Sequence, residues 1–350
     1  MCEGIVSPLT LERHVRQVTI GIVVYNHQDT ISQTVRSVAR QSFSDFLLVV
    51  WDNGSRDRSR EIIQREPAVG KFIFSERNVG FSSAHNEIIR RFPSRYYFCL
   101  NPDVILHENY LELLLEKAER VPSAGSLSGR LYRFNSANEK VIDTVGHRMS
   151  YGLRCSNVGS GSKDCSAWVE EGERFGLCAA ATVYTRRAIE TVSTGGGFFD
   201  ERYFAYWEDV DLDWRLHCEG FRAVYVPEAL AYHLRGARVR RDDSVLYLGE
   251  RNRYLFVRKY RPQFLSLKIF WFYYIGEVYL LLKCFLSSEA RRSLRAKLDA
   301  AKIEIRPYEK RPSPAFLRPP YFHLSRREVR RTAKTLAWLL AMAAAVRLFL

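Results

Sequence analysis

The run VTIGIVVY at residues 18–25 decides the fold, because a largely apolar, β-branched stretch of this length suits a strand buried on both faces. After a short turn, Ile31, Val35 and Val38 follow at spacings of four and three, which is the pattern of a helix with one apolar face. Residues 46–51 are again apolar and predict a second strand. A strand, a helix and a strand in this order predict a parallel pair joined by a crossover helix.

The same alternation continues along the chain. A helix is expected from Asp57, a strand at KFIF (71–74), a helix over 81–91 and a strand at YYFCL (96–100). Alternating strands and helices predict an α/β fold with a mostly parallel sheet and helices on both faces.

Polar residues follow each of these strands. In open α/β sheets ligands bind at the carboxyl ends of the strands. Any one of these clusters is also explained by turn chemistry, because Asn, Asp and Gly favour tight turns. Four clusters at successive strand ends predict a single ligand-binding crevice. The clusters are Tyr25-Asn26, Asp52 to Ser55, Arg77 to Phe81, and Asn101 to Asp103.

An acidic and aromatic segment, FFDERYFAYWEDVDLDWRLHCEGFRAVYVPEALAYH, occupies residues 198–233. It places Glu208, Asp209, Asp211 and Asp213 within six positions. One interpretation is an acidic helix start, in which Asp211 pairs with a basic residue one turn on. The other is that aromatic neighbours desolvate one carboxylate and raise its pKa towards that of a general base. The helix pattern alone leaves both interpretations open.

The positive charge of the protein lies at its C-terminal end. The 350 residues carry a net charge of +14, yet residues 235–350 hold 26 Lys/Arg against 9 Asp/Glu, and the rest is slightly acidic. Phe, Trp, Tyr and Leu alternate with these cations, which favours an anionic membrane surface over nucleic acid as the partner. The apolar stretches at 264–286 and 336–350 are expected to lie on the membrane, since one contains three charges and the other is short for a span.

The cysteines and the N-terminus indicate the compartment. Seven scattered cysteines form no CxxC pair, which predicts free thiols in a reducing environment. The first residues, MCEGIVSPLTLERHVRQ, lack the basic and apolar segments of a secretory signal, so we expect a cytoplasmic protein. We expect no zinc site at Cys155, Cys165 and Cys178, because their spacing is irregular. Four histidines are expected to be surface or core residues: His85, His107, His147 and His217.

Several of these motifs, in unbroken order, resemble the family-2 glycosyltransferases, and the rhamnosyltransferase-like bacterial branch most closely. The resemblance covers roughly residues 18–260. It implies a GT-A (Rossmann-like) fold and inverting transfer of rhamnose or a similar hexose from a nucleoside-diphosphate donor, with dTDP-rhamnose the expected donor. The implied acceptor is a hydroxyl of a lipid-linked glycan in cell-surface polysaccharide synthesis. The motifs are YN (25–26), DNGSRD (52–57), RNVGFSSAHN (77–86), NPD (101–103), FGLCAAATVYTRR (175–187) and the segment 198–233.

The resemblance also implies roles for individual residues. Asp209 would be the base that takes the acceptor proton, with Glu208 holding an acceptor hydroxyl or orienting the loop. Asp52 would accept a hydrogen bond from the nucleoside base, or else cap its turn. The other expected donor-binding residues are Tyr25, Asn26, Asn78, Gly80, Asn101, Asp103, Gly176, Arg251 and Arg253. A solvated basic face is the alternative for the two arginines.

A divalent cation, Mg2+ or Mn2+, would stabilise the leaving diphosphate. The implied ligands are Asp103, at the position of the family's DXD motif, and His233, for which a packed core histidine is the alternative. Asn101 stands where the first acid of that motif is expected, which leaves few protein ligands for the metal.

We therefore expect an N-terminal extension (1–17), a GT-A catalytic domain (18–262) and a C-terminal helical, basic, membrane-associating region (263–350). The protein would lie on the inner face of the cytoplasmic membrane. Two alternatives are a non-catalytic, membrane-anchored sugar or nucleotide binder, and a sugar-1-phosphate nucleotidyltransferase. The second would need a glycine-rich loop after the first strand, where the sequence has VVYNHQDT.

Overall fold

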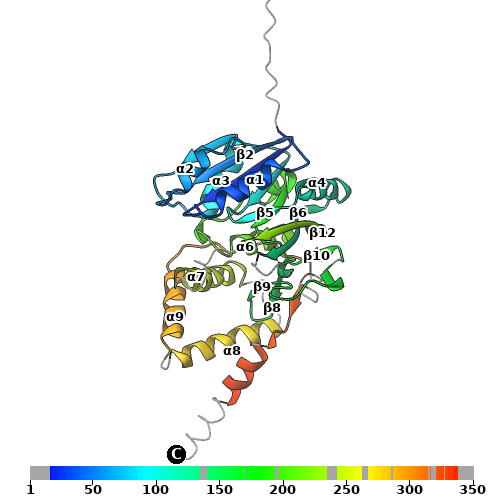
Figure 1. The fold of residues 1–350 in the computed structure, drawn as a ribbon. Coiled ribbons are helices and arrows are strands. Elements are labelled where there is room, and N and C mark those ends of the chain that lie inside the picture. The colour runs from blue at the N-terminus through cyan, green and yellow to red at the C-terminus, as the bar shows by residue number, and fades with distance from the viewer. Residues whose placement is uncertain are drawn as a thin grey trace, which may run out of the picture.

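A computed structural model gives the arrangement of the chain (Figure 1). It describes residues 16–134, 140–168, 170–193, 197–234, 243–261, 267–284, 287–313, 316, 321–326 and 328–337. The expected N-terminal extension lies almost entirely outside these residues, as do residues 338–350 of the second apolar stretch.

The main sheet has the strand order β10-β12-β6-β11-β4-β1-β2-β3, with β5 paired to β12 and β7 to β6. Strands β4, β1, β2 and β3 are mutually parallel, as the sequence predicts, while β11 runs antiparallel between β4 and β6. The strands are β1 (Val18–Val24), β2 (Phe46–Asp52), β3 (Lys71–Phe74), β4 (Tyr96–Leu100), β5 (Val104–Leu106), β6 (Ala124–Arg133), β7 (Val141–Thr144), β10 (Gly172–Arg174), β11 (Ala181–Thr185) and β12 (Arg222–His233).

Helices cover both faces of this sheet, and each face has its own apolar core. One core joins the sheet to α1 (Ile31–Ala39), α2 (Ser59–Gln64) and α4 (Tyr110–Arg120). The other joins it to α3 (Phe81–Arg91), α5 (Arg186–Val192) and α6 (Glu208–Cys218). The expected α/β layering is confirmed, and the apolar side chains of α1 explain it, because they recur on one side of the helix and are fully buried.

Helix α6 is buried on more than one side. Leu212 and Leu216 face the sheet core, while Val210 and Trp214 belong to a second core built with the C-terminal helices. These helices are α7 (Asp243–Tyr260), α8 (Leu267–Lys283) and α9 (Ser288–Ala301). The aromatic residues around α6 are therefore the contact between the sheet and the C-terminal region, which lies below it in Figure 1.

Residues 133–174 are rich in Gly, Ser and Asn, a composition typical of a long loop, but much of the segment forms strands. It contains β7, β10 and the small strands β8 (His147–Ser150) and β9 (Cys155–Asn157). Strand β8 pairs with β9 and with β13 (Phe322–His323), which forms a second, three-stranded sheet. These strands are short and polar, and β13 is distant in the sequence, so the segment carries no local strand pattern.

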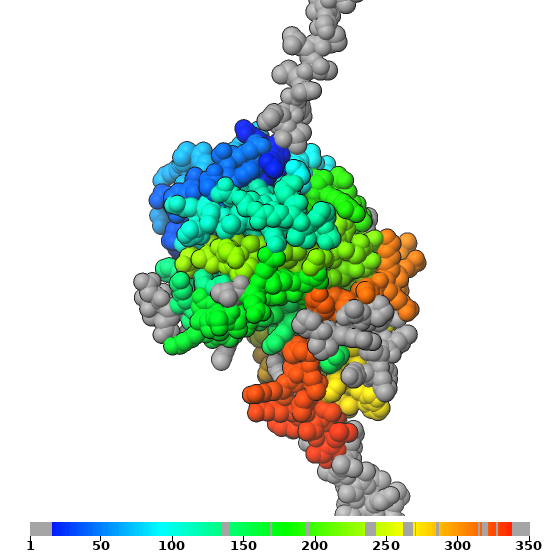
Figure 2. Space-filling view, turned by 90° about the vertical axis from the view of Figure 1, so that its right-hand side faces the viewer, coloured from blue at the N-terminus to red at the C-terminus, as the bar shows by residue number. Residues whose placement is uncertain are grey.

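The C-terminal region is helical, as expected, and packs on the body through α7 and β13. Figure 2 shows the blue and cyan N-terminal half at one end of the molecule and the yellow and red C-terminal helices at the other. Among the described helices, none has the length and apolar content required to cross a bilayer.

Candidate active site

The carboxyl ends of β1, β2 and β4 lie at the same edge of the sheet. Val24 is level with Asp52, so Tyr25 and Asn53 leave the sheet together, while Leu100 is level with Ile22, so Asn101 leaves the same edge two residues earlier. The structure thus brings the polar clusters together at one edge, as the parallel pattern predicts.

Asp52 ends β2 with a fully buried carboxylate. One oxygen accepts a hydrogen bond from the Ser55 amide at 3.1 Å, and the other lies 3.2 Å from the guanidinium of Arg60. The turn-capping alternative is therefore realised in the structure. Asn26, next to it, has a φ of 58° and accepts a hydrogen bond from the Arg56 amide. Tyr25 is the most open of the expected donor-binding residues at this strand end, with 41% of its surface exposed.

Asn78 and Gly80 shape the next strand end. The side-chain amide of Asn53 donates hydrogen bonds to Asn78 Oδ1 at 2.9 Å and to the Gly80 carbonyl at 3.2 Å. Gly80 has a φ of 90°, and a Cβ there would lie 2.7 Å from the Phe204 carbonyl oxygen. Glycine is required because the loop before α6 passes directly over this position.

That loop, residues 203–207, has a strained backbone. Phe204, Tyr206 and Trp207 have φ values of 65°, 68° and 73°, a region that costs bulky residues about 1–3 kcal/mol each. On one side the Phe204 carbonyl accepts a hydrogen bond from the Phe81 amide, at the start of α3. Strain of this kind persists only where surrounding contacts enforce it.

Asn252 of α7 holds the other side of the loop. Its fully buried side-chain amide donates hydrogen bonds of 2.7–2.8 Å to the carbonyls of Tyr203, Ala205 and Tyr206. Arg251 adds a hydrogen bond of 2.8 Å to the Arg202 carbonyl. Helix α7 therefore fixes the path of the chain immediately before the acid pair of α6.

Glu208 and Asp209 begin α6 and differ in environment. Glu208 is buried, and its Oε2 atom makes no hydrogen bond within the described residues. Burial raises the pKa of Glu208 well above its ordinary value, and the neighbouring Asp209 carboxylate raises it further. The Asp209 side chain is 15% exposed, and its Oδ2 lies 3.5 Å from the Ala179 amide. Two neighbouring carboxyl groups in different environments can divide the roles of general acid and general base between them.

The acid pair lies close to the end of β4. The Asn101 amide donates a hydrogen bond of 2.8 Å to the Ala180 carbonyl, and Ala179 is the residue that contacts Asp209. Asp209 is thus connected to the strand-end residues through one short segment of chain.

Asp211 belongs to a buried network with no opening towards this edge. It pairs with Arg215 at 2.9 Å, as the sequence predicts, and with Lys259 of α7 at 2.6 Å. Lys259 also contacts Asp200 at 2.8 Å. The network ties α6 to α7, so its role is to position the helix.

His147 and Asp213 form a contact that the sequence did not reveal. His147 Nδ1 lies 3.1 Å from Asp213 Oδ2, and its Nε2 lies 3.8 Å from Asp209 Oδ2. Burial lowers the pKa of His147, but the Cys155 thiol, Asp209 and Asp213 outweigh it and raise that pKa well above its ordinary value. Gly176 packs here, because a Cβ at that position would overlap the Asp213 carboxylate. Gly176 therefore packs against Asp213, and its expected part in donor binding stays a prediction.

Asp103 and His233 lie together, as expected for metal ligands. His233 Nε2 is 3.2 Å from Asp103 Oδ1, and its Nδ1 is 2.9 Å from the buried Asp143. Burial lowers the pKa of His233, but these two carboxylates outweigh it and raise the pKa to about 9. An imidazole held by a second carboxylate is typical of metal-binding histidines, so the residues fit a divalent ion. Asn101 provides no second acid at this point.

The comparisons with known proteins add the family. Residues 19–166 match the model for the family described as Glycosyl transferase family 2. Over these residues the chain is similar to that family. The poly-beta-1,6-N-acetyl-D-glucosamine synthase of Staphylococcus aureus (strain MSSA476) is 24% identical over 221 residues, which is 62% of this chain and 50% of the synthase. The synthase of Staphylococcus epidermidis is 24% identical over 226 residues, covering 63% and 51%. The chain thus spans about half the length of the curated relatives it matches.

Solved structures show the same fold at low sequence identity. GalNAc-T7, with UDP, GalNAc and Mn2+, superposes with a TM-score of 0.57 at 13% identity, covering 83% of this chain and 55% of that one. The mannosyltransferase PcManGT of Pyrobaculum calidifontis, with GDP-Man and Mn2+, gives 0.50 at 14% identity, covering 96% and 81%. The expected GT-A fold is confirmed. The relatives named above are not rhamnosyltransferases, so the expected branch stays a prediction.

Arg251 and Arg253, both on α7, contact backbone carbonyls in the structure. Arg253 is buried and donates hydrogen bonds of 2.7–2.8 Å to the carbonyls of Gly152 and Leu153. Arg251 contacts the loop before α6. A solvated face does not describe Arg253, which ties α7 to the turn between β8 and β9, and its donor-binding role stays a prediction.

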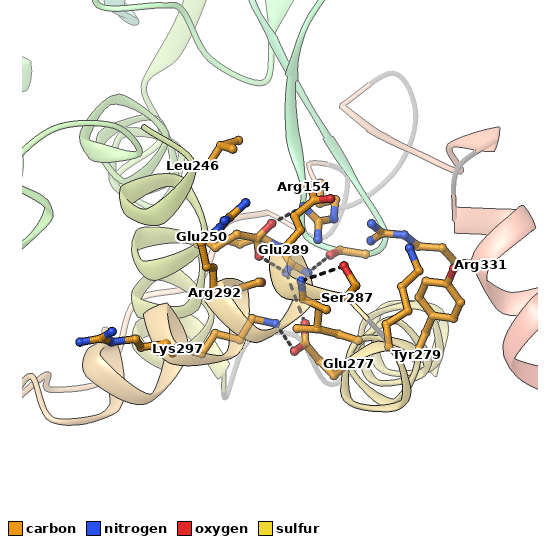
Figure 3. Close-up of a pocket in the computed structure, with 18 of the residues that line it drawn as sticks. Arg154, Leu246, Glu250, Glu277, Tyr279, Ser287, Glu289, Arg292, Lys297 and Arg331 are labelled. Atoms are coloured by element: carbon orange, nitrogen blue, oxygen red, sulfur yellow. Dashed lines mark hydrogen bonds and ion pairs between the residues drawn. The ribbon is translucent and has the colours of Figure 1, made fainter. Parts of the chain in front are cut away.

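A cavity of about 520 Å3 lies between α7, α8, α9 and the C-terminal helical segment (Figure 3). Its lining mixes cations with acids, and many are paired, as Arg154 is with Glu250 at 2.9 Å. It is separate from the strand ends, on the opposite side of α7 from the loop that Asn252 holds.

Proposed function

We propose that the chain is an inverting glycosyltransferase that moves a hexose from a nucleoside-diphosphate donor to a hydroxyl of a membrane-linked glycan. The observation that supports this most directly is the connection from Asp209 through Ala179 and Ala180 to Asn101, which joins the acid pair to the strand ends of the main sheet. Donor and acceptor would meet between these two groups.

In the proposed reaction Asp209 accepts the proton of the acceptor hydroxyl. The hydroxyl oxygen attacks the anomeric carbon, and the bond from that carbon to the diphosphate breaks with inversion. Glu208, kept protonated by burial, donates a hydrogen bond to the acceptor. The structure suits this division because Asp209 is the more open of the two acids.

The donor site would use the strand-end residues, and a divalent ion would be held by Asp103 and His233. When bound, Mg2+ or Mn2+ neutralises charge on the leaving diphosphate. Because each strand end is already joined by internal hydrogen bonds, Asp52 would have to contact the nucleoside with an oxygen that now meets Ser55 or Arg60. The donor residues remain Tyr25, Asn26, Asp52, Asn78, Gly80, Asn101 and Asp103.

The identity of the donor sugar is the first point to test. The named relatives make an N-acetylglucosamine polymer, and the solved neighbours hold UDP or GDP-Man, whereas the sequence resemblance favours dTDP-rhamnose. Thermal shift with each of these nucleotide sugars, with and without Mn2+, identifies the donor. We expect one of them to raise the melting temperature, and more so with Mn2+.

Asp209→Asn then separates transfer from simple binding. We expect this variant to bind the donor normally and to lose transfer by at least about 100-fold, the lower range for a positioned base. Asp45→Asn, which changes an exposed carboxylate far from α6, is the matched control. Normal transfer by Asp209→Asn would reject the proposed base, and donor binding without transfer in the wild-type protein would favour a non-catalytic binder.

We also propose that α8 rests on the inner face of the cytoplasmic membrane. Trp271, Tyr274, Val278 and Leu281 are all exposed and follow at spacings of three, four and three, which places them along one side of the helix. Trp and Tyr favour the interfacial region of a bilayer, and the basic residues that follow favour anionic lipid.

Sedimentation with vesicles tests this surface. Leu281→Glu should reduce pelleting with anionic vesicles, while Phe134→Glu, at an exposed residue of the body, should not. Equal pelleting of both variants and the wild-type protein would reject α8 as the contact.

A further inference from the structure

One group of metal-ligating side chains falls outside the expected metal site. His147 begins β8, Cys178 precedes β11 and Asp209 lies in the first turn of α6. One ligand atom from each lies within 4.8 Å of the others, and no other such trio of His, Cys, Asp or Glu occurs in the described part of the chain. We propose that these three residues bind a thiolate-preferring divalent cation, best represented by Zn2+, and that the ion blocks Asp209.

The spacing of His147 and Asp209 fits a shared metal ion better than it fits a hydrogen bond. His147 Nε2 and Asp209 Oδ2 are 3.8 Å apart, which is too long for a hydrogen bond. Zinc bonds of about 2.0–2.1 Å place two ligands of a tetrahedral ion roughly 3.3 Å apart. A shift of about half an ångström in either side chain would bring both atoms to a shared ion.

A second carboxylate already orients the histidine. His147 Nδ1 lies 3.1 Å from Asp213 Oδ2, and the other oxygen of Asp213 accepts a hydrogen bond from the Leu177 amide at 3.3 Å. When Nδ1–H donates a hydrogen bond to Asp213 and Nε2 carries no proton, the lone pair of Nε2 points away from Asp213 and can bind a metal. Such carboxylate partners are typical of histidine ligands in zinc proteins.

Exposure leaves room for a fourth ligand. His147 is buried, whereas Cys178 and Asp209 are partly exposed, so water can complete the coordination. The set of one imidazole, one thiolate and one carboxylate favours Zn2+ over Mg2+ or Mn2+, which prefer oxygen ligands. Binding releases two protons to solvent, the Cys178 thiol proton and the second imidazole proton of His147, since a thiolate and a neutral imidazole are the ligands. The two metal sites would therefore differ in the ions they select.

The consequence for catalysis rests on the proposed function. An ion bound to Asp209 occupies the lone pairs that would accept the acceptor proton, so Zn2+ would inhibit transfer even when Mn2+ fills the site at Asp103 and His233. Sequence spacing does not indicate this trio, because its three members lie far apart along the chain.

Titration with Co2+ tests the binding without any need for activity. A thiolate bound to Co2+ gives a charge-transfer absorption band in the near ultraviolet, which the site at Asp103 and His233 cannot produce. We expect the band in the wild-type protein and in Cys218→Ser, the control, but not in Cys178→Ser, and we expect Zn2+ to remove it. Absence of the band in the wild-type protein, or its persistence in Cys178→Ser, would overturn the proposal.

Two further measurements keep the outcome clear. In the unmodified protein Zn2+ should slow alkylation of Cys178, followed by peptide mass spectrometry, which serves if Cys178→Ser fails to fold. In the transfer assay Zn2+ should inhibit Cys178→Ser at least about tenfold more weakly than wild type, as expected for loss of a ligand. Equal inhibition of both would overturn the blocking role. A protein without transfer activity would still show the cobalt band, so failure of the proposed function is distinguishable.

Discussion

Asn252→Ala tests whether α7 holds the loop at residues 203–207 in its strained path. The variant removes three hydrogen bonds of 2.7–2.8 Å to the carbonyls of Tyr203, Ala205 and Tyr206. A buried carbonyl that loses its donor costs about 1 kcal/mol or more, so the three together are worth about 3 kcal/mol. The positive φ values in the loop add a tendency to relax once these contacts are gone.

A loss of about 3 kcal/mol corresponds to roughly a 100-fold fall in kcat, if the relaxed loop displaces the acid pair. We expect KM for the donor to rise by less than about tenfold, since the loop contacts the donor residue Gly80 while Asn26 and Asp52 keep their own hydrogen bonds. Steady-state transfer gives the two constants, and hydrogen exchange of the amides in the loop should accelerate independently of activity.

Arg258→Met is the matched control. Arg258 also lies on α7 and also donates to two carbonyls, those of Ala300 and Ile303, but these lie in the C-terminal region. We expect it to lower the melting temperature with little change in kcat. If Asn252→Ala retains near wild-type kcat and normal exchange in the loop, the clamp does not position the acids and the reasoning is wrong.

Three further predictions concern stability. Burial lowers the pKa of His85 to about 3, whereas its pKa in the unfolded chain is about 6.5. The free energy of unfolding is therefore highest above pH 6.5 and falls by about 2 kcal/mol by pH 5, because the unfolded chain takes up the proton first. Denaturant unfolding of His85→Gln at several pH values should lack this pH dependence. Gly176→Ala should unfold at lower temperature in calorimetry, because the added Cβ overlaps the buried Asp213 carboxylate. Gly249→Ala in α7 has open space for its Cβ, so its free energy of unfolding should rise by about 0.5–1 kcal/mol. Lys259→Met should lose about 1–3 kcal/mol in urea unfolding, because two buried aspartates lose a shared hydrogen-bond donor while Asp211 keeps Arg215 and Asp200 keeps Arg202. An unchanged free energy of unfolding would contradict this.

The sequence predicts the parallel half of the fold well, because each of its strands is an apolar run and each helix shows its own period. The strand at 71–74 and the helix at 81–91 agree with the structure residue for residue. The ion pair of Asp211 with Arg215 was also predictable, since it is local along one helix.

Long-range contacts were not predictable in this way. His147 meets Asp213 across 66 residues, and Asn252 meets the loop at 203–206 across 46 to 49, so no spacing in the sequence relates them. Arg253 was expected near phosphate, but its partners are backbone carbonyls, which carry no sequence signature. Charged residues indicate where chemistry is possible, while burial decides which of them are available for it.

The pairing of β13 with β8 has a consequence for synthesis of the protein. His323 contacts Met149 across 174 residues, and β8 is the strand that carries His147 to the acid pair. The ribosome must therefore release residues 322–323 before β8 gains its second neighbour. Until then one edge of β8 stays unpaired and is accessible to chaperones.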